Sequence, residues 1–211
     1  MFIGREAELA FLKDKYEEER GQLVVLYGRR RVGKTETLRE FCKGKPHVFF
    51  SCTQCADKVQ LGRFSKQLLK ENIPAAQYIS EFSDWEKAFR AILELPYGDK
   101  KKLIIVDEFP YMCKGNAAIP SILQNLWDEA LKDSNVMIIL CGSAMSFIEK
   151  ELLAEKNPLY GRATGIYKMR EMSFYDACKF FPDYTAREKV VAYAVLGGIP
   201  HYLNQFRKEL S

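Results

Sequence analysis

A stretch from Gly28 to Thr35 has the residue types and spacing of a phosphate-binding site. It reads Gly-Arg-Arg-Arg-Val-Gly-Lys-Thr and matches the pattern G-x-x-x-x-G-K-[ST] at every required position. In such a loop, backbone N–H groups surround phosphate oxygens, the lysine adds positive charge and the threonine hydroxyl binds Mg²⁺. Glycine is needed where a side chain would block close approach or the required dihedral angles. We therefore predict nucleotide binding by Gly28, Arg31, Val32, Gly33, Lys34, Thr35 and Glu36.

Two adjacent carboxylates follow an apolar run at residues 102–106. We expect Asp107 to hold Mg²⁺ and Glu108, which points differently, to take a proton from the attacking water. Ser143 follows a second apolar run, residues 136–141, and Gly142. Ser143 is placed either to hydrogen-bond the γ-phosphate or the lytic water, or to cap the helix that follows, and both interpretations stay open.

Other residues with candidate chemistry are less specific. Arg162 ends a polar loop and is either a phosphate ligand, for its own nucleotide or a neighbouring subunit's, or an exposed loop arginine. Cys52 and Cys55 form a C-x-x-C pair with only His47 as a nearby further ligand. A closed zinc site needs about four ligands, so we interpret this pair as reduced thiols at the end of a strand.

The surrounding pattern predicts the elements that position these residues. Short apolar runs typical of strands at residues 22–27, 47–52, 102–106, 136–141 and 166–169 alternate with helical segments, which include 59–71 and 119–132. The pattern favours an α/β fold of the P-loop NTPase type, with a parallel five-stranded sheet between two helical layers. A Ser-x-x-Glu capping box predicts a helix start at Ser83.

Only helical patterns follow residue 169, so we expect a nucleotide-binding domain over residues 1–182 and the beginning of a helical lid over 183–211. The last helix has too few companions to close a bundle. We therefore expect the natural protein to continue beyond residue 211.

Composition excludes several classes of protein. The 211 residues are 47% hydrophobic and 28% charged, with a formal net charge of +4. Basic residues are dispersed apart from two short runs, so composition gives no case for DNA binding. The apolar runs are too short to cross a bilayer, and the N-terminus lacks the order of a signal peptide. We expect a cytoplasmic protein with no membrane partner.

Several segments together resemble the archaeal-type ATPases of the STAND group of P-loop NTPases, which are relatives of AAA+ and Orc/Cdc6 proteins. Besides the phosphate loop and Asp107-Glu108, they are Phe-Ile-Gly-Arg-Glu at residues 2–6, Leu-Cys-Gly-Ser at 140–143, Pro-Leu-Tyr-Gly-Arg at 158–162 and Gly-Gly-Ile-Pro-His-Tyr at 197–202. The last two are the more specific to this family.

The resemblance implies further roles. The strand that ends at Ser143 would lie between the phosphate-loop strand and the Asp107 strand. Ile3, Gly4 and Arg5 would approach the adenine side, and Pro200 belongs to a segment that resembles a lid motif over the base. Arg162 resembles the family's arginine. Family members usually carry a winged-helix segment and a nuclease-like domain, so the resemblance implies DNA as a partner only through a C-terminal region that these residues lack.

The sequence thus predicts a Mg²⁺-dependent module that binds and hydrolyses ATP and acts as a nucleotide-driven switch. Catalysis is assigned to Lys34, Glu108, Ser143 and Arg162, and metal binding to Thr35 and Asp107. Turnover should be slow in isolation if a homo-oligomer supplies the arginine in trans. The alternatives are a nucleotide-binding module with little hydrolysis, a DNA-directed ATPase and a small-molecule kinase. Asp107-Glu108 and the Gly-Gly-Ile-Pro segment argue against the kinase.

Overall fold

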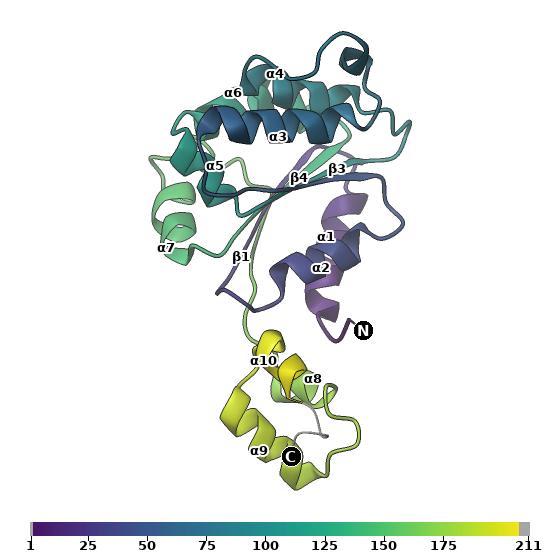
Figure 1. Cartoon of the computed structure of the whole chain (residues 1–211), viewed down its shortest axis with the longest axis vertical. Coiled ribbons are helices and arrows are strands. Elements are labelled where there is room, and N and C mark those ends of the chain that lie inside the picture. Colours follow the sequence, from purple (N-terminus) through teal and green to yellow (C-terminus); the bar gives the residue numbers. More distant parts are fainter. Residues whose placement is uncertain (1, 207–211) are drawn as a thin grey trace.

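The computed structural model describes residues 2–206 and is built around a five-stranded sheet (Figure 1). Each pair of neighbouring strands is parallel, and the strand order is β2-β3-β4-β1-β5. The strands are β1 (Gln22–Tyr27), β2 (His47–Ser51), β3 (Lys102–Asp107), β4 (Val136–Gly142) and β5 (Gly165–Lys168). The predicted parallel α/β fold is confirmed, and β4 lies between β1 and β3 as the family resemblance implied.

Helices cover both faces of the sheet because the three central strands are apolar on both sides. Odd positions of β1, such as Leu23 and Val25, pack with α3 (Asp57–Leu69), α4 (Trp85–Arg90), α5 (Phe109–Gly115) and α6 (Ile119–Glu129). Even positions, such as Val24 and Leu26, pack with α1 (Glu6–Glu17) and α2 (Lys34–Cys42). The alternation of side chains along a strand thus produces the predicted three layers.

At two helices the N-cap is a residue other than the serine that the sequence offers. The helix expected at Ser83 begins at Trp85, and its N-cap is Asp84, whose side chain accepts a hydrogen bond from the Lys87 amide. A carboxylate one residue closer to the helix therefore replaces the serine as the cap. After β4, a short helix α7 (Met145–Phe147) continues into a π-helical turn, η4 (Ile148–Leu152). Its N-cap is Ala144, so Ser143 does not cap it.

Three short 3₁₀ turns complete the α/β part of the chain. They are η1 (Pro74–Gln77), η2 (Ala91–Glu94) and η3 (Leu131–Asp133).

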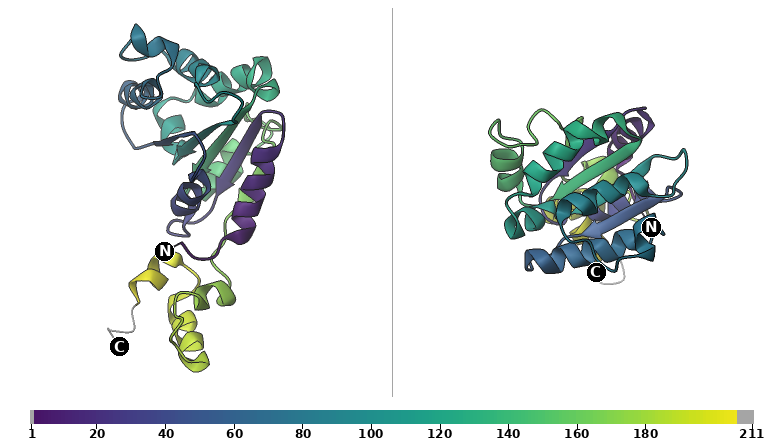
Figure 2. Two further views of the ribbon diagram at one scale, coloured as in Figure 1. Left: turned by 90° about the vertical axis from the view of Figure 1, so that its right-hand side faces the viewer. Right: turned by 90° about the horizontal axis from the view of Figure 1, so that it is seen from above.

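The chain beyond residue 171 forms a separate small apolar cluster, which we call the helical unit (residues 172–206). It contains α8 (Phe174–Cys178), α9 (Ala186–Leu196) and α10 (Pro200–Gln205), and it extends beyond one end of the α/β part (Figure 2, left). Ala177 and Phe181 pack with Ala192 and Leu203. α8 therefore shares this core with the later helices, and the domain boundary near residue 182 stays a prediction.

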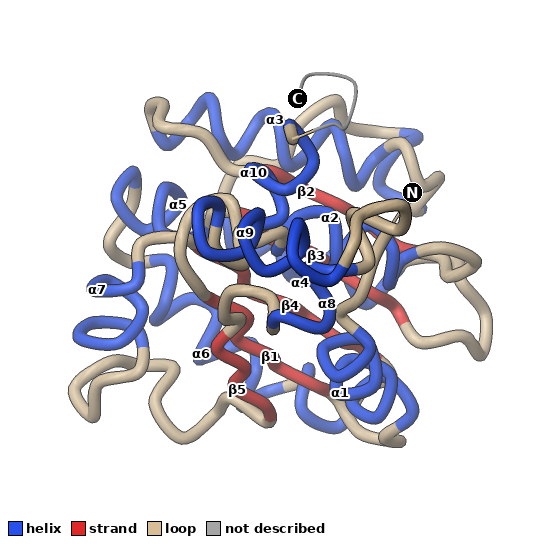
Figure 3. Tube along the Cα trace, turned by 90° about the horizontal axis from the view of Figure 1, so that it is seen from below, coloured by secondary structure: helices blue, strands red, loops and turns tan. Residues whose placement is uncertain are grey.

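Seen from below, the helical unit lies across the ends of the strands (Figure 3). Its second helix begins with the capping box that the sequence indicates, formed by Thr185 and Glu188. Within residues 2–206, the longest helices are too short and too polar to traverse a lipid bilayer.

Candidate functional site

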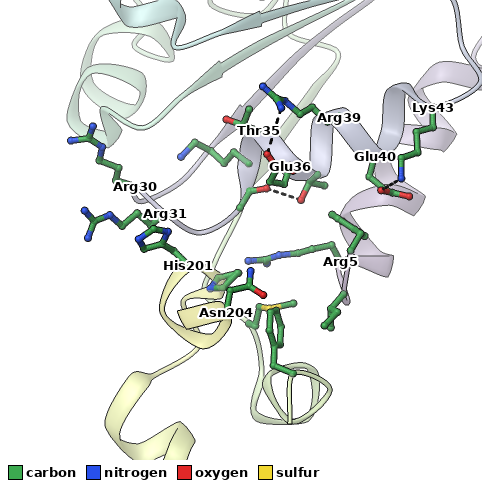
Figure 4. A pocket seen from close by; sticks show the side chains of 18 of the residues that line it. Arg5, Arg30, Arg31, Thr35, Glu36, Arg39, Glu40, Lys43, His201 and Asn204 are labelled. Atoms are coloured by element: carbon green, nitrogen blue, oxygen red, sulfur yellow. Dashed lines mark hydrogen bonds and ion pairs between the residues drawn. The ribbon is translucent and has the colours of Figure 1, made fainter. Parts of the chain in front are cut away.

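A cavity of about 740 Å³ lies between the carboxyl end of the sheet and the helical unit (Figure 4). The phosphate loop, α2, the N-terminal segment and α10 all contribute to its wall. Ligands of open α/β sheets bind at this end of the strands. The cavity brings together most of the predicted site residues, namely Ile3, Arg5, Arg31, Gly33, Lys34, Thr35, Glu36, Glu108 and Pro200.

The phosphate loop joins β1 to α2 by two left-handed backbone positions. Arg31 has φ 70° and Gly33, the N-cap of α2, has φ 95°. Lys34 is buried, and its Nζ donates to the carbonyl oxygens of Gly28 and Arg29, each at 2.9 Å. Since α2 begins at Lys34, its free amides and positive dipole end face the cavity. The loop therefore presents one ammonium group and several amide donors to an anion.

Thr35 and Asp107 meet at the edge of this loop. The Thr35 hydroxyl donates to Asp107 Oδ2 at 2.8 Å, and the amide of Glu108 donates to Asp107 Oδ1 at 3.0 Å. Asp107 is only 4% exposed. A hydroxyl and a carboxylate are hard oxygen donors, and Mg²⁺ is usually held by one or two such protein ligands together with water and substrate phosphates. The residues present therefore fit this ion.

Neighbouring thiols are not competing ligands for that site. Burial raises the pKa of the Cys141 thiol well above its ordinary value, and the charge of Asp107 raises it further. The same two causes, with burial the larger, raise the pKa of Cys52. Burial therefore favours the protonated form of both thiols, which is a poorer metal ligand than the thiolate.

Glu108 adopts a backbone conformation that is rare outside glycine, with φ 54° and ψ 42°. Such a left-handed residue costs about 1 to 3 kcal/mol and is found most often at functional sites. The conformation directs its carboxylate to the end of β4, where Oε2 accepts from the Ser143 hydroxyl at 3.0 Å and the Ser143 amide at 3.2 Å. Ser143 therefore contacts the Glu108 carboxylate and does not cap α7, and its hydrogen bond to the γ-phosphate or the lytic water stays a prediction.

Arg5 lies inside the wall of the cavity and holds three segments together. Its guanidinium donates to Glu8 at 2.7 Å, to the carbonyl of Arg170 at 2.9 Å and to the carbonyl of Val32 at 2.5 Å. The side chain of Val32 is fully buried in the core, so only its backbone belongs to the loop surface. Arg5 thus braces the phosphate loop from behind through Val32.

The rest of the N-terminal segment forms one end of the cavity. Ile3 lines it with Phe2, Met172 and Phe180. Gly4 has φ 69°, a backbone conformation that favours glycine, and a Cβ there would lie 2.7 Å from the flexible end of the Met172 side chain, which would have to shift. Phe2 belongs to the segment at residues 2–6 that resembles the family. Met172 and Phe180 reach the cavity only through the folding of the helical unit, and no local sequence pattern indicates them.

Arg162 lies elsewhere, in a shallow hollow beside Gln22, the first residue of β1. The phosphate loop follows the last residue of β1, so the length of this strand, roughly 16 Å, separates the two ends. Arg162 pairs with Asp128 at 2.6 Å and donates to the Pro158 carbonyl at 2.9 Å. The structure therefore does not bring Arg162 to the phosphate loop of its own chain.

The C-x-x-C pair has ordinary surroundings. Cys52 is buried, and the half-exposed Cys55 contacts the side-chain oxygen of Gln60 at 3.3 Å. Among residues 2–206, no group of three or more His, Cys, Asp and Glu side chains is arranged to hold a metal ion.

Comparison with known proteins places this geometry in a family. A family model described as an ATPase domain predominantly from Archaea matches residues 2–206. An uncharacterised protein of Methanocaldococcus jannaschii is 32% identical over 207 residues, which cover 98% of this chain and 44% of the relative. The chain therefore spans less than half the length of that relative.

Solved structures share the fold at lower identity. The Walker-type ATPase of Pyrococcus abyssi superposes with a TM-score of 0.72 at 22% identity, over 96% of this chain and 66% of that one. A signal-transduction ATPase with numerous domains from Pyrococcus horikoshii, which has a tetratricopeptide repeat sensor, superposes with a TM-score of 0.60 at 17% identity. The match covers 97% of this chain and 29% of that one. The family model thus covers nearly the whole chain, phosphate loop and helical unit included, and this chain belongs to the predominantly archaeal family of ATPase domains.

Proposed function

We propose that this domain binds and hydrolyses ATP with Mg²⁺ and uses the nucleotide to change the position of its helical unit. One observation carries the proposal: the carboxylate of Asp107 is in contact with the hydroxyl of Thr35, the residue that follows Lys34 in the phosphate loop. A phosphate loop without a carboxylate at this place would bind an anion. The added carboxylate supplies the second ligand that a metal-bound triphosphate needs.

The roles of the residues follow from their positions. The loop amides and Lys34 hold the phosphates, while Thr35 and Asp107 hold the metal ion, which offsets the negative charge on the outer phosphate oxygens when bound. Glu108 accepts a proton from the attacking water. The Ser143 hydroxyl fixes the Glu108 carboxylate through its 3.0 Å hydrogen bond and orients it for that proton transfer.

The apolar end of the cavity is the natural place for the adenine ring. Phe2, Ile3, Met172, Phe180 and Pro200 line it, and an aromatic base is favourably buried against such side chains. Three of these residues, Met172, Phe180 and Pro200, belong to the helical unit. A base held between them would therefore draw the helical unit toward the phosphate loop, which is the basis of the proposed switch.

Arg162 enters this proposal as a residue supplied to another copy. Its guanidinium is at the far end of β1 from its own loop, and its location near the surface supports contact with the nucleotide of a neighbouring subunit. An arginine supplied in trans can raise phosphoryl transfer by about 10³ to 10⁵. We therefore propose a homo-oligomer for full activity and slow turnover by a single copy.

Phosphate release tests the hydrolytic role of Glu108. Under saturating ATP and Mg²⁺, Glu108→Gln should bind ATP about as tightly as wild type and release phosphate at least about 100-fold more slowly, because general base catalysis contributes about 10² to 10⁴. Glu19→Gln is the matched control, since Glu19 is an exposed glutamate outside the cavity. Equal rates for wild type and Glu108→Gln would remove Glu108 from the mechanism.

Binding is tested separately by calorimetry with Lys34→Ala. Loss of the ammonium should weaken ATP binding at least about tenfold, because a charge-assisted contact to phosphate contributes about 1.5 to 3 kcal/mol. Undiminished binding by Lys34→Ala would place the nucleotide elsewhere.

A further inference from the structure

The phosphate loop carries three consecutive arginines. Arg31 contacts Tyr202 of the helical unit, and Arg29 contacts Glu171, the residue directly before that unit. Arg31 Nη1 donates to the Tyr202 hydroxyl of α10 at 3.0 Å, and its guanidinium carbon lies 5.6 Å from the centre of the Tyr202 ring. Arg29 pairs with Glu171 at 3.1 Å. The loop that encloses phosphate is therefore joined directly to the element expected to move.

The backbone of Arg31 makes this connection mechanically relevant. Its φ of 70° is unusual for an arginine, and the loop needs that conformation to curve toward Gly33. A side chain anchored at its far end on Tyr202 restricts the dihedral angles at Arg31. The same contact holds α10 next to the loop, where Pro200 Cγ lies 3.7 Å from the position that a Cβ on Gly33 would occupy.

The two arginine contacts differ in how much they stabilise the structure. The side chains of Arg29 and Glu171 are 71% and 40% exposed, and an ion pair this open to solvent contributes little. Arg31 is also exposed, but Tyr202 is half-buried and offers it both a hydroxyl acceptor and a ring face. A charged donor on a neutral acceptor, together with a cation–π contact, is the stronger combination.

We propose that Arg31 and Tyr202 form a clasp that couples nucleotide binding in the phosphate loop to the position of α10. The clasp rests on the proposed function, because it requires the loop to bind ATP. Coupling between two equilibria is reciprocal: a nucleotide that orders the loop strengthens the clasp, and the clasp in turn retains the nucleotide. Arg31 and Tyr202 are positioning residues, and they are assigned no part in the chemical step.

A double-mutant cycle tests the clasp. The variants are Tyr202→Phe, which removes only the hydroxyl, Arg31→Gly, which removes the side chain but tolerates the left-handed backbone, and the pair combined. Dissociation of a fluorescent ATP analogue with Mg²⁺ is followed by stopped flow. Tyr202→Phe should accelerate dissociation about three- to tenfold. In the Arg31→Gly background the same change should have no further effect, because its partner is gone.

Tyr175→Phe is the matched control. Tyr175 lies on α8 of the same helical unit, 81% exposed and outside the cavity, so dissociation should remain at the wild-type rate. Hydrogen exchange supplies a readout that a purely structural role would not change. ATP should slow exchange of the α10 amides in wild type and in Tyr175→Phe, and this protection should shrink in Tyr202→Phe.

Two results would overturn the clasp while leaving the proposed function intact. One is that the protein binds ATP, but Tyr202→Phe changes the dissociation rate by the same factor in the wild-type and Arg31→Gly backgrounds. The other is ATP protection of α10 that is the same in wild type and Tyr202→Phe. Failure of the wild-type protein to bind the analogue at all would overturn the proposed function and the clasp together.

Discussion

Replacement of the first phosphate-loop glycine, Gly28→Ala, separates two reasons for the presence of glycine there. One reason is that a side chain would obstruct phosphate. The structure adds another: a Cβ on Gly28 would lie 2.3 Å from the carbonyl oxygen of Met169, in the segment that leads to the helical unit. Met169 cannot easily yield, because its amide donates to the Tyr27 carbonyl at 2.7 Å and so extends the pairing of β1 with β5.

The magnitude follows from that contact. Added bulk in a close-packed region costs about 1 to 3 kcal/mol, and a contact this short with backbone falls at the upper end. A loss of about 2 to 3 kcal/mol should lower the midpoint of thermal unfolding by about 4 to 12 °C for a chain of this size. The mutation should therefore destabilise the protein even in the absence of nucleotide.

Thermal unfolding followed by circular dichroism, without nucleotide, measures the effect. Gly115→Ala is the control, since its Cβ would meet no atom closer than 3.6 Å at the end of α5. It should stay within about 0.5 kcal/mol of wild type, because a substitution without new close contacts changes stability little. If Gly28→Ala unfolds at the wild-type temperature and fails only to bind ATP, the packing argument is refuted.

Three further outcomes test single contacts. Ser143→Ala removes the hydroxyl that donates to Glu108, so turnover should fall at least about tenfold with ATP affinity nearly unchanged; equal turnover in a phosphate-release assay would contradict this role. The hydrogen bond from Arg162 lowers the pKa of Asp128 in the folded state. The pair therefore stabilises the fold at any pH above the ordinary carboxyl pKa, and this stabilisation is lost as the pH falls through the lowered pKa of Asp128. Urea unfolding should show Arg162→Ala less stable at pH 7 by under about 1 kcal/mol, with the difference shrinking below pH 3.8. A difference of the same size at pH 7 and at low pH would argue against the ion pair and leave only the hydrogen bond to the Pro158 carbonyl, which does not titrate. Burial raises the pKa of Cys113 to about 12, so Ellman's reagent at pH 8 should modify this thiol only after unfolding, as mass spectrometry of the labelled peptides would show.

Local sequence patterns predicted most of the elements because each strand is a short apolar run that can be recognised from a few consecutive residues. Residues 22–27 were expected as a strand and form β1 with the same bounds. The start of α4 was less readable. Ser83 and Asp84 are both good caps in sequence, and the hydrogen bond from Lys87 to Asp84 decided between them.

The positions of the helical unit were harder to predict. Residues 174–178 carry a helical pattern that fits either domain. Only the packing of Ala177 and Phe181 against Ala192 and Leu203 assigns α8 to the helical unit. The apolar face of an amphipathic helix indicates that it packs against another element, but the pattern does not identify that element.

The sequence by itself determined which residues gather at the phosphate end of the cavity, and their chemical roles stay predictions. Lys34, Thr35 and Asp107 were identified because a phosphate loop and a strand-terminal carboxylate each fit within a few consecutive residues. Tertiary structure alone decided that Arg5 braces the loop and that Arg162 lies at the opposite end of β1. An arginine side chain is long and finds its partner across the fold, so its role depends on residues far away in the sequence, as the contact of Arg5 with Arg170 illustrates.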